Sequence, residues 1–95
     1  MLIDTPYKEN DVISIKLTSG EELVAKLLAE DANFATISKP LSLTATQQGM
    51  GLTPFMFTVD PEAKFRINQA SIVCIVKTLD EMASNYIQST TGLKI

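Results

Sequence analysis

Apolar and polar residues alternate from Ile13 to Leu17 in the segment 12–17, near the start of the chain. Three apolar side chains fall on one side of an extended backbone there: Ile13, Ile15 and Leu17. Alternation of this kind is typical of a strand with one buried face. The next residues, 18–21, are small or polar, and Gly20 can take the positive φ that a tight turn requires. We therefore predict a strand at 12–17 followed by a turn at Gly20.

Residues 22–28 fit two kinds of element. In a helix Leu23 and Leu27 would share a face with Lys26, and in a strand they would share it with Ala25. Glu, Leu, Ala and Lys favour helix intrinsically. The short turn just before this segment favours the second strand of a hairpin instead. We predict the strand.

A third strand is predicted at 34–44, after a polar turn. Ile37, Leu41 and Leu43 are expected to face inward from it. Pro40 lies inside this segment, and because proline cannot donate to a strand ladder it marks an edge, a bulge or a sharp bend.

The middle of the chain predicts a flexible loop and two more strands. The loop is expected at 46–51, where two glycines lie among polar residues. A fourth strand then begins at 54–59, with three apolar side chains on one face: Phe55, Phe57 and Val59. A turn at 60–62 interrupts it, and 65–67 resumes the extended chain. A fifth, buried strand is predicted at 71–77.

The last element is predicted to be a helix of about 78–90. Thr78 is placed to cap its N-terminus, with Glu81 three residues later completing a capping box. The following residues form one apolar stripe at helical spacing: Leu79, Met82, Ala83, Tyr86 and Ile87. Gly92 is expected to end the helix. The stripe predicts packing on the sheet or on a neighbouring chain.

Together these elements predict a small protein of the mainly β class. The chain has 95 residues, which suits one domain. Five short strands on this length favour a strongly bent antiparallel barrel of the SH3-like kind, followed by a helix. We divide the chain into an N-terminal arm (1–11), the barrel (12–77) and a C-terminal helix and tail (78–95).

Composition and charge narrow the functional classes. The chain is 45% apolar and 20% charged, which is ordinary for a globular domain. Its 8 basic and 11 acidic residues give a net charge of −3. This acidic balance argues against non-specific binding to duplex DNA and against docking on an anionic membrane. It leaves open a local site for single-stranded bases.

The histidine and cysteine content excludes several kinds of chemistry. There is no histidine, so a Ser–His or Cys–His pair and a His-containing zinc site are impossible. Cys74, the one cysteine, lies in the apolar run 72–76, which predicts an inert core thiol. We expect neither enzymatic activity nor a cofactor. That apolar run is far shorter than a membrane span and the N-terminus has no signal-peptide pattern, so we expect a cytoplasmic protein.

Residues 12–31 resemble the first motif of the Sm and Sm-like (LSm, Hfq-like) RNA-binding proteins. That motif has an alternating strand, a glycine turn, a second strand and an acidic residue at its end, here Asp31. Asn33 and Phe34 then lie where the family places an Asn or an aromatic residue in the loop that lines the RNA pore. Residues 67–72 lie where the shorter second motif is expected.

The chain departs from the family pattern in three ways. The interval from Asp31 to Ile37 is one residue short. Asn68 and Gln69 replace an Arg-Gly or Lys-His pair, which removes a cation that contacts phosphate or stacks on a base. The predicted helix follows the last strand, whereas the family's helix usually precedes the first.

The resemblance implies a homo-oligomeric ring that binds short single-stranded RNA, rich in uridine or adenine. Rings of this family close by pairing the fourth strand of one subunit with the fifth of the next. Here the first edge would be 55–59 with 65–67, and the second would be 71–76; both are apolar. The acidic balance favours an alternative, a non-enzymatic protein-interaction module for assembly that keeps the barrel but has lost RNA binding.

The candidate RNA site consists of five residues: Asp31, Asn33, Phe34, Asn68 and Gln69. A carboxamide offers both donors and an acceptor to a base edge, and an aromatic ring can stack on a base. The carboxylate is expected to hold the turn by accepting backbone N–H groups. Plainer roles fit the same residues: a turn former at 33, a core side chain at 34 and a solvated turn at 68–69.

Overall fold

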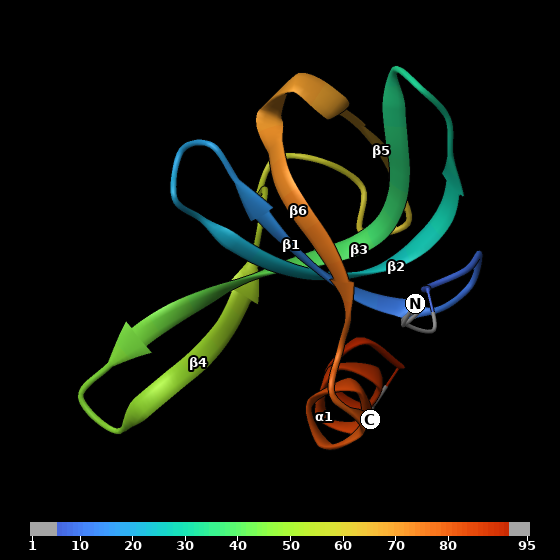
Figure 1. The fold of residues 1–95 in the computed structure, drawn as a ribbon. Coiled ribbons are helices and arrows are strands. Elements are labelled where there is room, and N and C mark those ends of the chain that lie inside the picture. The colour runs from blue at the N-terminus through green and yellow to red at the C-terminus, as the bar shows by residue number, and fades with distance from the viewer. Residues whose placement is uncertain (1–5, 92–95) are drawn as a thin grey trace.

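The fold is mainly β, as predicted. A computed structural model describes residues 6–91, which form six antiparallel strands in one sheet and one C-terminal helix (Figure 1). The elements are β1 (Val12–Leu17), β2 (Glu22–Glu30), β3 (Phe34–Thr46), β4 (Gly49–Pro54), β5 (Lys64–Asn68), β6 (Ile72–Lys77) and α1 (Asp80–Thr91). The strand order is β4-β3-β2-β1-β6, and β5 also pairs with β3. Within residues 6–91 no strand pairing joins β5 to β6, so the sheet is open.

The hairpin of β1 and β2 supplies most of the core. Alternate side chains of both strands are buried on the same face: Ile13, Ile15, Leu17, Leu23, Ala25 and Leu27. The turn between the strands has Gly20 at φ +99°, as predicted. The strand predicted at 22–28 is therefore confirmed, because burial of alternate side chains against the sheet outweighs the helix propensity of its residues.

A bulge in β3 moves its apolar residues to the other face of the sheet. Ser38 lies opposite Lys26 and Leu41 opposite Val24, so β3 has one residue more than β2 between these pairs. Lys39 takes the left-handed φ of +51° inside this bulge. An added residue reverses which side chains face the core. Of the three alternatives predicted for Pro40, an edge, a bulge or a sharp bend, the structure has the bulge.

The same bulge makes the predicted inward position of two leucines wrong. Beyond it, Ser42 lies opposite the core residue Leu23. Leu41 and Leu43 alternate with Ser42, so they lie on the outer face of the sheet. Both are half-buried, and neither belongs to the core cluster.

The predicted loop at 46–51 and the strand at 54–59 are wrong. β3 continues to Thr46, and a two-residue turn leads directly into β4, which ends at Pro54. Gly49 has a φ of +118° at this turn, so a glycine read as a sign of flexibility serves a tight hairpin. Residues 55–63 then leave the sheet, and the side chain of Phe57 is 79% exposed. The resumed strand predicted at 65–67 is confirmed as β5.

β4 and β5 lie end to end along one edge of β3. β5 pairs with 34–38 of β3, and β4 pairs with 41–46 beyond the bulge. β5 contains the resumed end of the predicted fourth strand, whereas β4 begins within the predicted loop, so the number of strands rises from five to six. Residues 55–63 connect these two strands.

β6 is an edge strand and is not buried as predicted. It pairs with β1, and its side chains Ile72 and Ile75 pack against the core. Val73 and Val76 are 62% and 58% exposed. Cys74 is exposed as well, so the prediction of a core thiol is wrong. The continuous apolar run hid the alternation of the strand, because apolar side chains stand on both of its faces.

The C-terminal helix is confirmed, but its predicted capping box and its full stripe are not. α1 begins at Asp80, one position too late for Thr78 to be its N-cap. The buried Thr78 hydroxyl instead lies 2.8 Å from Ser14 Oγ on β1. Of the predicted stripe, Tyr86 is buried, whereas Leu79 and Ile87 are 77% and 48% exposed. Gly92 lies outside the described residues, as do residues 1–5 of the predicted arm.

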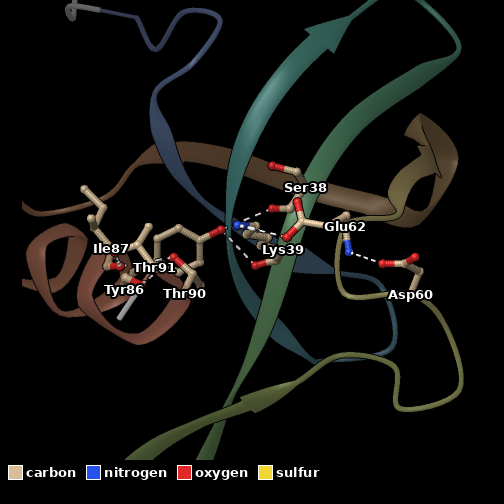
Figure 2. A network of polar contacts seen from close by, with 8 residues as sticks. All are labelled: Ser38, Lys39, Asp60, Glu62, Tyr86, Ile87, Thr90 and Thr91. Carbon is tan, nitrogen blue, oxygen red and sulfur yellow. Dashed lines mark hydrogen bonds and ion pairs between the residues drawn. The ribbon is translucent and has the colours of Figure 1, made fainter. Parts of the chain in front are cut away.

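Tyr86 fixes α1 to the bulge of β3. Figure 2 shows its hydroxyl directed at the backbone of β3, where it donates to the carbonyl oxygens of Lys39 (2.8 Å) and Ser38 (3.1 Å). The Lys39 ammonium also lies 3.6 Å from the exposed carboxylate of Glu62. An ion pair of this exposure adds little stability, so the buried tyrosine is the main attachment.

Candidate nucleic-acid interface

The fold brings the two predicted loops together. One is the turn between β2 and β3, and the other is the short 3₁₀ turn (Gln69–Ser71) that joins β5 to β6. Phe34 lies opposite Asn68 in the pairing of β3 with β5. The backbone N–H of Gln69 donates to the carbonyl of Asn33 at 2.9 Å. The five residues predicted from two separate segments therefore belong to one surface.

Asp31 organises the first loop. Its carboxylate accepts hydrogen bonds from the backbone N–H groups of Asn33 and Phe34, both at 2.8 Å. The backbone N–H of Asp31 in turn donates to the carbonyl of Phe34 at 2.9 Å. The two accepted bonds, helped by the positive charge of Arg66, hold the pKa of Asp31 below its usual value. Asp31 thus has the turn-holding geometry that the sequence predicts.

Gln69 connects the second loop to the first through its side chain. Its Nε2 donates to Glu30 Oε2 (2.7 Å) and to the carbonyl of Asp31 (3.1 Å). The other carboxylate oxygen of Glu30 accepts from the hydroxyl of Tyr7 at 2.7 Å. Burial, with help from this carboxylate, raises the pKa of Tyr7 to about 12. Glu30 and Tyr7, which sequence reasoning did not single out, therefore hold the two loops in register.

Asn68 and Asn33 use their amides differently. The Oδ1 atom of Asn68 accepts from the backbone N–H of Ala70 at 2.9 Å and caps the 3₁₀ turn. The side chain of Asn33 is exposed at the tip of its turn. Asn33 is thus placed to offer its amide to a ligand, whereas Asn68 mainly shapes the loop.

Arg66 adds a cation that the sequence prediction did not include in the candidate site. Its guanidinium carbon lies 4.0 Å from the centroid of the Phe34 ring, within the range of a cation–π interaction. Phe34 is half-buried and does not belong to the core cluster. The signal was present in β5, where Lys64, Arg66 and Asn68 alternate with apolar residues and so share the exposed face.

The surface carries both signs of charge. Glu30 and Asp31 contribute carboxylates, and Arg66 and Lys64 contribute cations on the neighbouring strand. Arg66 supplies a planar group that can contact a phosphate or stack on a base. The two carboxylates weaken the attraction of this surface for a polyanion.

Other kinds of site find little support in the part of the chain described. Among residues 6–91 no group of three His, Cys, Asp or Glu residues is placed to hold a metal ion. No helix in this range is both long and apolar enough to cross a membrane. Comparison of the chain with models of known protein families finds no match, and comparison with curated proteins finds none either.

Proposed function

We propose that this chain is an Sm-like ring protein that binds short single-stranded RNA on the surface formed by residues 31–34 and 66–69. The observation that supports it is the convergence of the two loops, with Arg66 stacked on Phe34. The proposed RNA site consists of the five residues predicted from the sequence together with Arg66. Asn33 reads base edges, Phe34 and Arg66 offer stacking planes, and Asp31 holds the turn.

Arg66 compensates for one departure from the family pattern, the loss of the cation in the second loop. Asn68 and Gln69 stand where the family has a cation. Arg66 supplies a cation two residues before Asn68, on the same face of β5. Because side chains two apart on a strand point the same way, this guanidinium lies beside the loops without belonging to them. We propose that it takes over the contact with phosphate or base.

Ring formation is supported by the two free edges of the open sheet. β5 pairs with β3 on one side, and β6 pairs with β1 on one side. Within the described residues each leaves one row of backbone groups without a strand partner, and such edges pair readily with another chain. We propose that the sheet is one wall of a bent barrel and that β5 of one copy pairs with β6 of the next. Pairing between different edges is heterologous and closes into a ring when the rotation permits.

A second candidate function is assembly through protein contacts alone. It is favoured by the carboxylates of Glu30 and Asp31 beside the candidate surface and by the net charge of −3. In this alternative the ring forms in the same way, but Phe34 and Arg66 stabilise each other and contact no base. The chemistry of the surface offers no catalytic pair in either case.

Two measurements on the purified chain test these proposals separately. Light scattering at micromolar concentration should give a defined oligomer, and a monomer would overturn the ring. Fluorescence polarisation with labelled U-rich and A-rich oligonucleotides should show binding that weakens as salt rises. Gln88→Ala, a change on the exposed face of α1, serves as a control that should bind like the wild type. An oligomer that binds neither oligonucleotide at low salt would establish the assembly alternative instead.

A further inference from the structure

The outer half of β3 and β4 form a hairpin arm, residues 41–54, with one apolar face. Figure 1 shows this arm projecting away from the rest of the sheet. Directly opposed pairs alternate along it, with Leu43 opposite Leu52 and Ala45 opposite Met50 on one face. The pairs between them are small or polar and stand on the other face: Ser42 with Thr53, Thr44 with Gly51 and Thr46 with Gly49.

The apolar face of the arm lies on the outer side of the sheet, where α1 packs. The bulge at Lys39 and Pro40 turns Leu41 and Leu43 to that side, as described above. Near the base of the arm a cavity of about 330 Å³ is lined by Leu41 and Pro54 and, from α1, by Ser89 and Thr90. Figure 1 shows that α1 does not extend along the arm, so the helix covers only the base of the arm. Met50, near the tip, is 62% exposed.

The arm carries no charge. No charged residue lies between Lys39 and Asp60, although one residue in five of the whole chain is charged. Such a surface offers nothing to the phosphates of RNA, whose binding depends on cations. It does suit a second copy of this chain, because two copies with a net charge of −3 repel each other least where their surfaces are uncharged.

A flank of α1 has matching properties. Ala83 and Ile87 are four residues apart and so lie on one side of the helix, beside the face that Tyr86 fixes to the sheet. Ile87 is 48% exposed. No charged residue lies between Glu81 and Lys94, so this flank is uncharged as well. A sheet face that lacks cover is normally packed by a helix or by another sheet.

We propose that the apolar face of the arm packs against the Ala83–Ile87 flank of α1 in a second copy of this chain. Within one copy, α1 packs on the outer face of the sheet at the base of the arm. The proposed contact with α1 of a second copy would continue this packing along the arm. β4 continues the edge on which β5 lies, so a copy that pairs with β5 stands beside the arm. The inference rests on the proposed ring and names a second contact within it.

Disulfide trapping tests which surface meets the arm. In a Cys74→Ser background, which removes the one native thiol, Met50→Cys is combined with a separately tagged chain that carries Ile87→Cys. The two chains are refolded together and oxidised mildly, and the mixed disulfide is measured on a non-reducing gel. The matched control is Gln88→Cys, because the next residue along the helix points about 100° away. We expect the mixed disulfide to form at least tenfold faster with Ile87→Cys than with Gln88→Cys.

Several outcomes would overturn the proposal. These are equal trapping at the two helix positions, a predominance of arm-to-arm disulfides, or the absence of a mixed disulfide in a chain that light scattering finds oligomeric. A monomeric chain would overturn the ring as well, so the two failures are distinguishable. A second measurement needs no cysteine: Met50→Glu should raise the concentration at which the oligomer dissociates at least tenfold. Thr44→Glu, with the same charge on the opposite face of the arm, should change it less than threefold.

Discussion

The Tyr86 hydroxyl donates a 2.8 Å hydrogen bond to the carbonyl oxygen of Lys39, the residue that takes a left-handed φ in the bulge of β3. Figure 2 shows this contact at the junction of the helix and the sheet. The bulge turns the outer half of β3 into the arm, and the tyrosine attaches the helix at the same point. A single side chain thus links the position of α1 to the backbone irregularity that shapes the sheet.

Removing the Tyr86 hydroxyl is expected to destabilise the fold modestly. Tyr86→Phe keeps the ring but leaves the carbonyls of Ser38 and Lys39 without this donor, which costs about 0.5–1.5 kcal/mol. Tyr86→Ala also opens a cavity and should cost about 3 kcal/mol or more. Urea unfolding measures both. Tyr7→Phe, which removes an exposed hydrogen bond to Glu30, is the control and should cost less than Tyr86→Phe.

Alkaline pH should destabilise the wild type more than Tyr86→Phe. Burial raises the pKa of Tyr86 from 10.0 to about 12 in the folded chain. Above pH 10 the unfolded chain releases this proton and the folded chain keeps it, so rising pH favours unfolding. The contribution is fully present below pH 10 and is lost as pH rises through the folded pKa, on the order of 1–3 kcal/mol in all. Unfolding free energies measured from pH 9 to 12 that fall in parallel for both proteins would contradict this.

The sequence predicted the inner sheet better than its periphery. Alternation located β1, and the short turn that follows it located β2, because both strands turn one face to the core. It failed at 55–59, where Phe57 and Val59 alternate like strand residues but lie in a loop. The strand that pairs with the free edge of β3 is β4, and the two glycines of β4 gave it a loop-like pattern. The exposure of Val73 and Val76 on β6 was not predicted either, because a continuous apolar run does not show which of its side chains face the core.

The turn between β1 and β2 depends on a glycine at one position. Gly20 has a φ of +99°, and a methyl group added there would meet no atom within 4 Å, so the strain of Gly20→Ala is purely in the backbone. We expect a loss of about 1 kcal/mol. Gly51→Ala is the matched control: its φ is not left-handed, and the nearest atom to an added methyl group would be 3.5 Å away, an ordinary contact. It should change stability by about 0.5 kcal/mol or less. Equal losses would rule out backbone strain as the cause.

The loss of stability at acidic pH should depend on Asp31. Its pKa is held below 3.8 chiefly by the N–H groups of Asn33 and then Phe34. A lowered folded pKa contributes stability that is present above the unfolded pKa and is lost as pH falls through the folded value. The urea midpoint of the wild type should therefore fall more steeply than that of Asp31→Asn between about pH 5 and pH 3. Identical slopes would show that the two hydrogen bonds do not favour the charged form.

Part of the candidate site was readable from the sequence, and part was not. The motif located three residues that lie close together in the sequence: Asp31, Asn33 and Phe34. The second loop was located by its distance from this motif along the chain. Arg66 and Glu30 were not assigned to the site because their relation to these residues is made by strand pairing. A register that sets Thr36 opposite Arg66 brings the guanidinium to Phe34 two residues away, and register is fixed only when the fold forms.

Variants at Phe34 and Arg66 should separate the contribution of stacking to RNA binding from the contribution of charge. Phe34→Ala should weaken binding of a U-rich or A-rich oligonucleotide by about 1–3 kcal/mol with little change in salt dependence, because no cation is lost. Arg66→Gln should lower the slope of log K against log salt by roughly 0.7, the value for one phosphate contact on a single strand. Arg66→Lys should keep that slope but bind more weakly, since an ammonium offers no plane to a base. Lys64→Gln, on the same face of β5, controls for a general loss of charge. Fluorescence polarisation at several salt concentrations gives every slope, and a Phe34→Ala chain that binds like the wild type would place the RNA elsewhere.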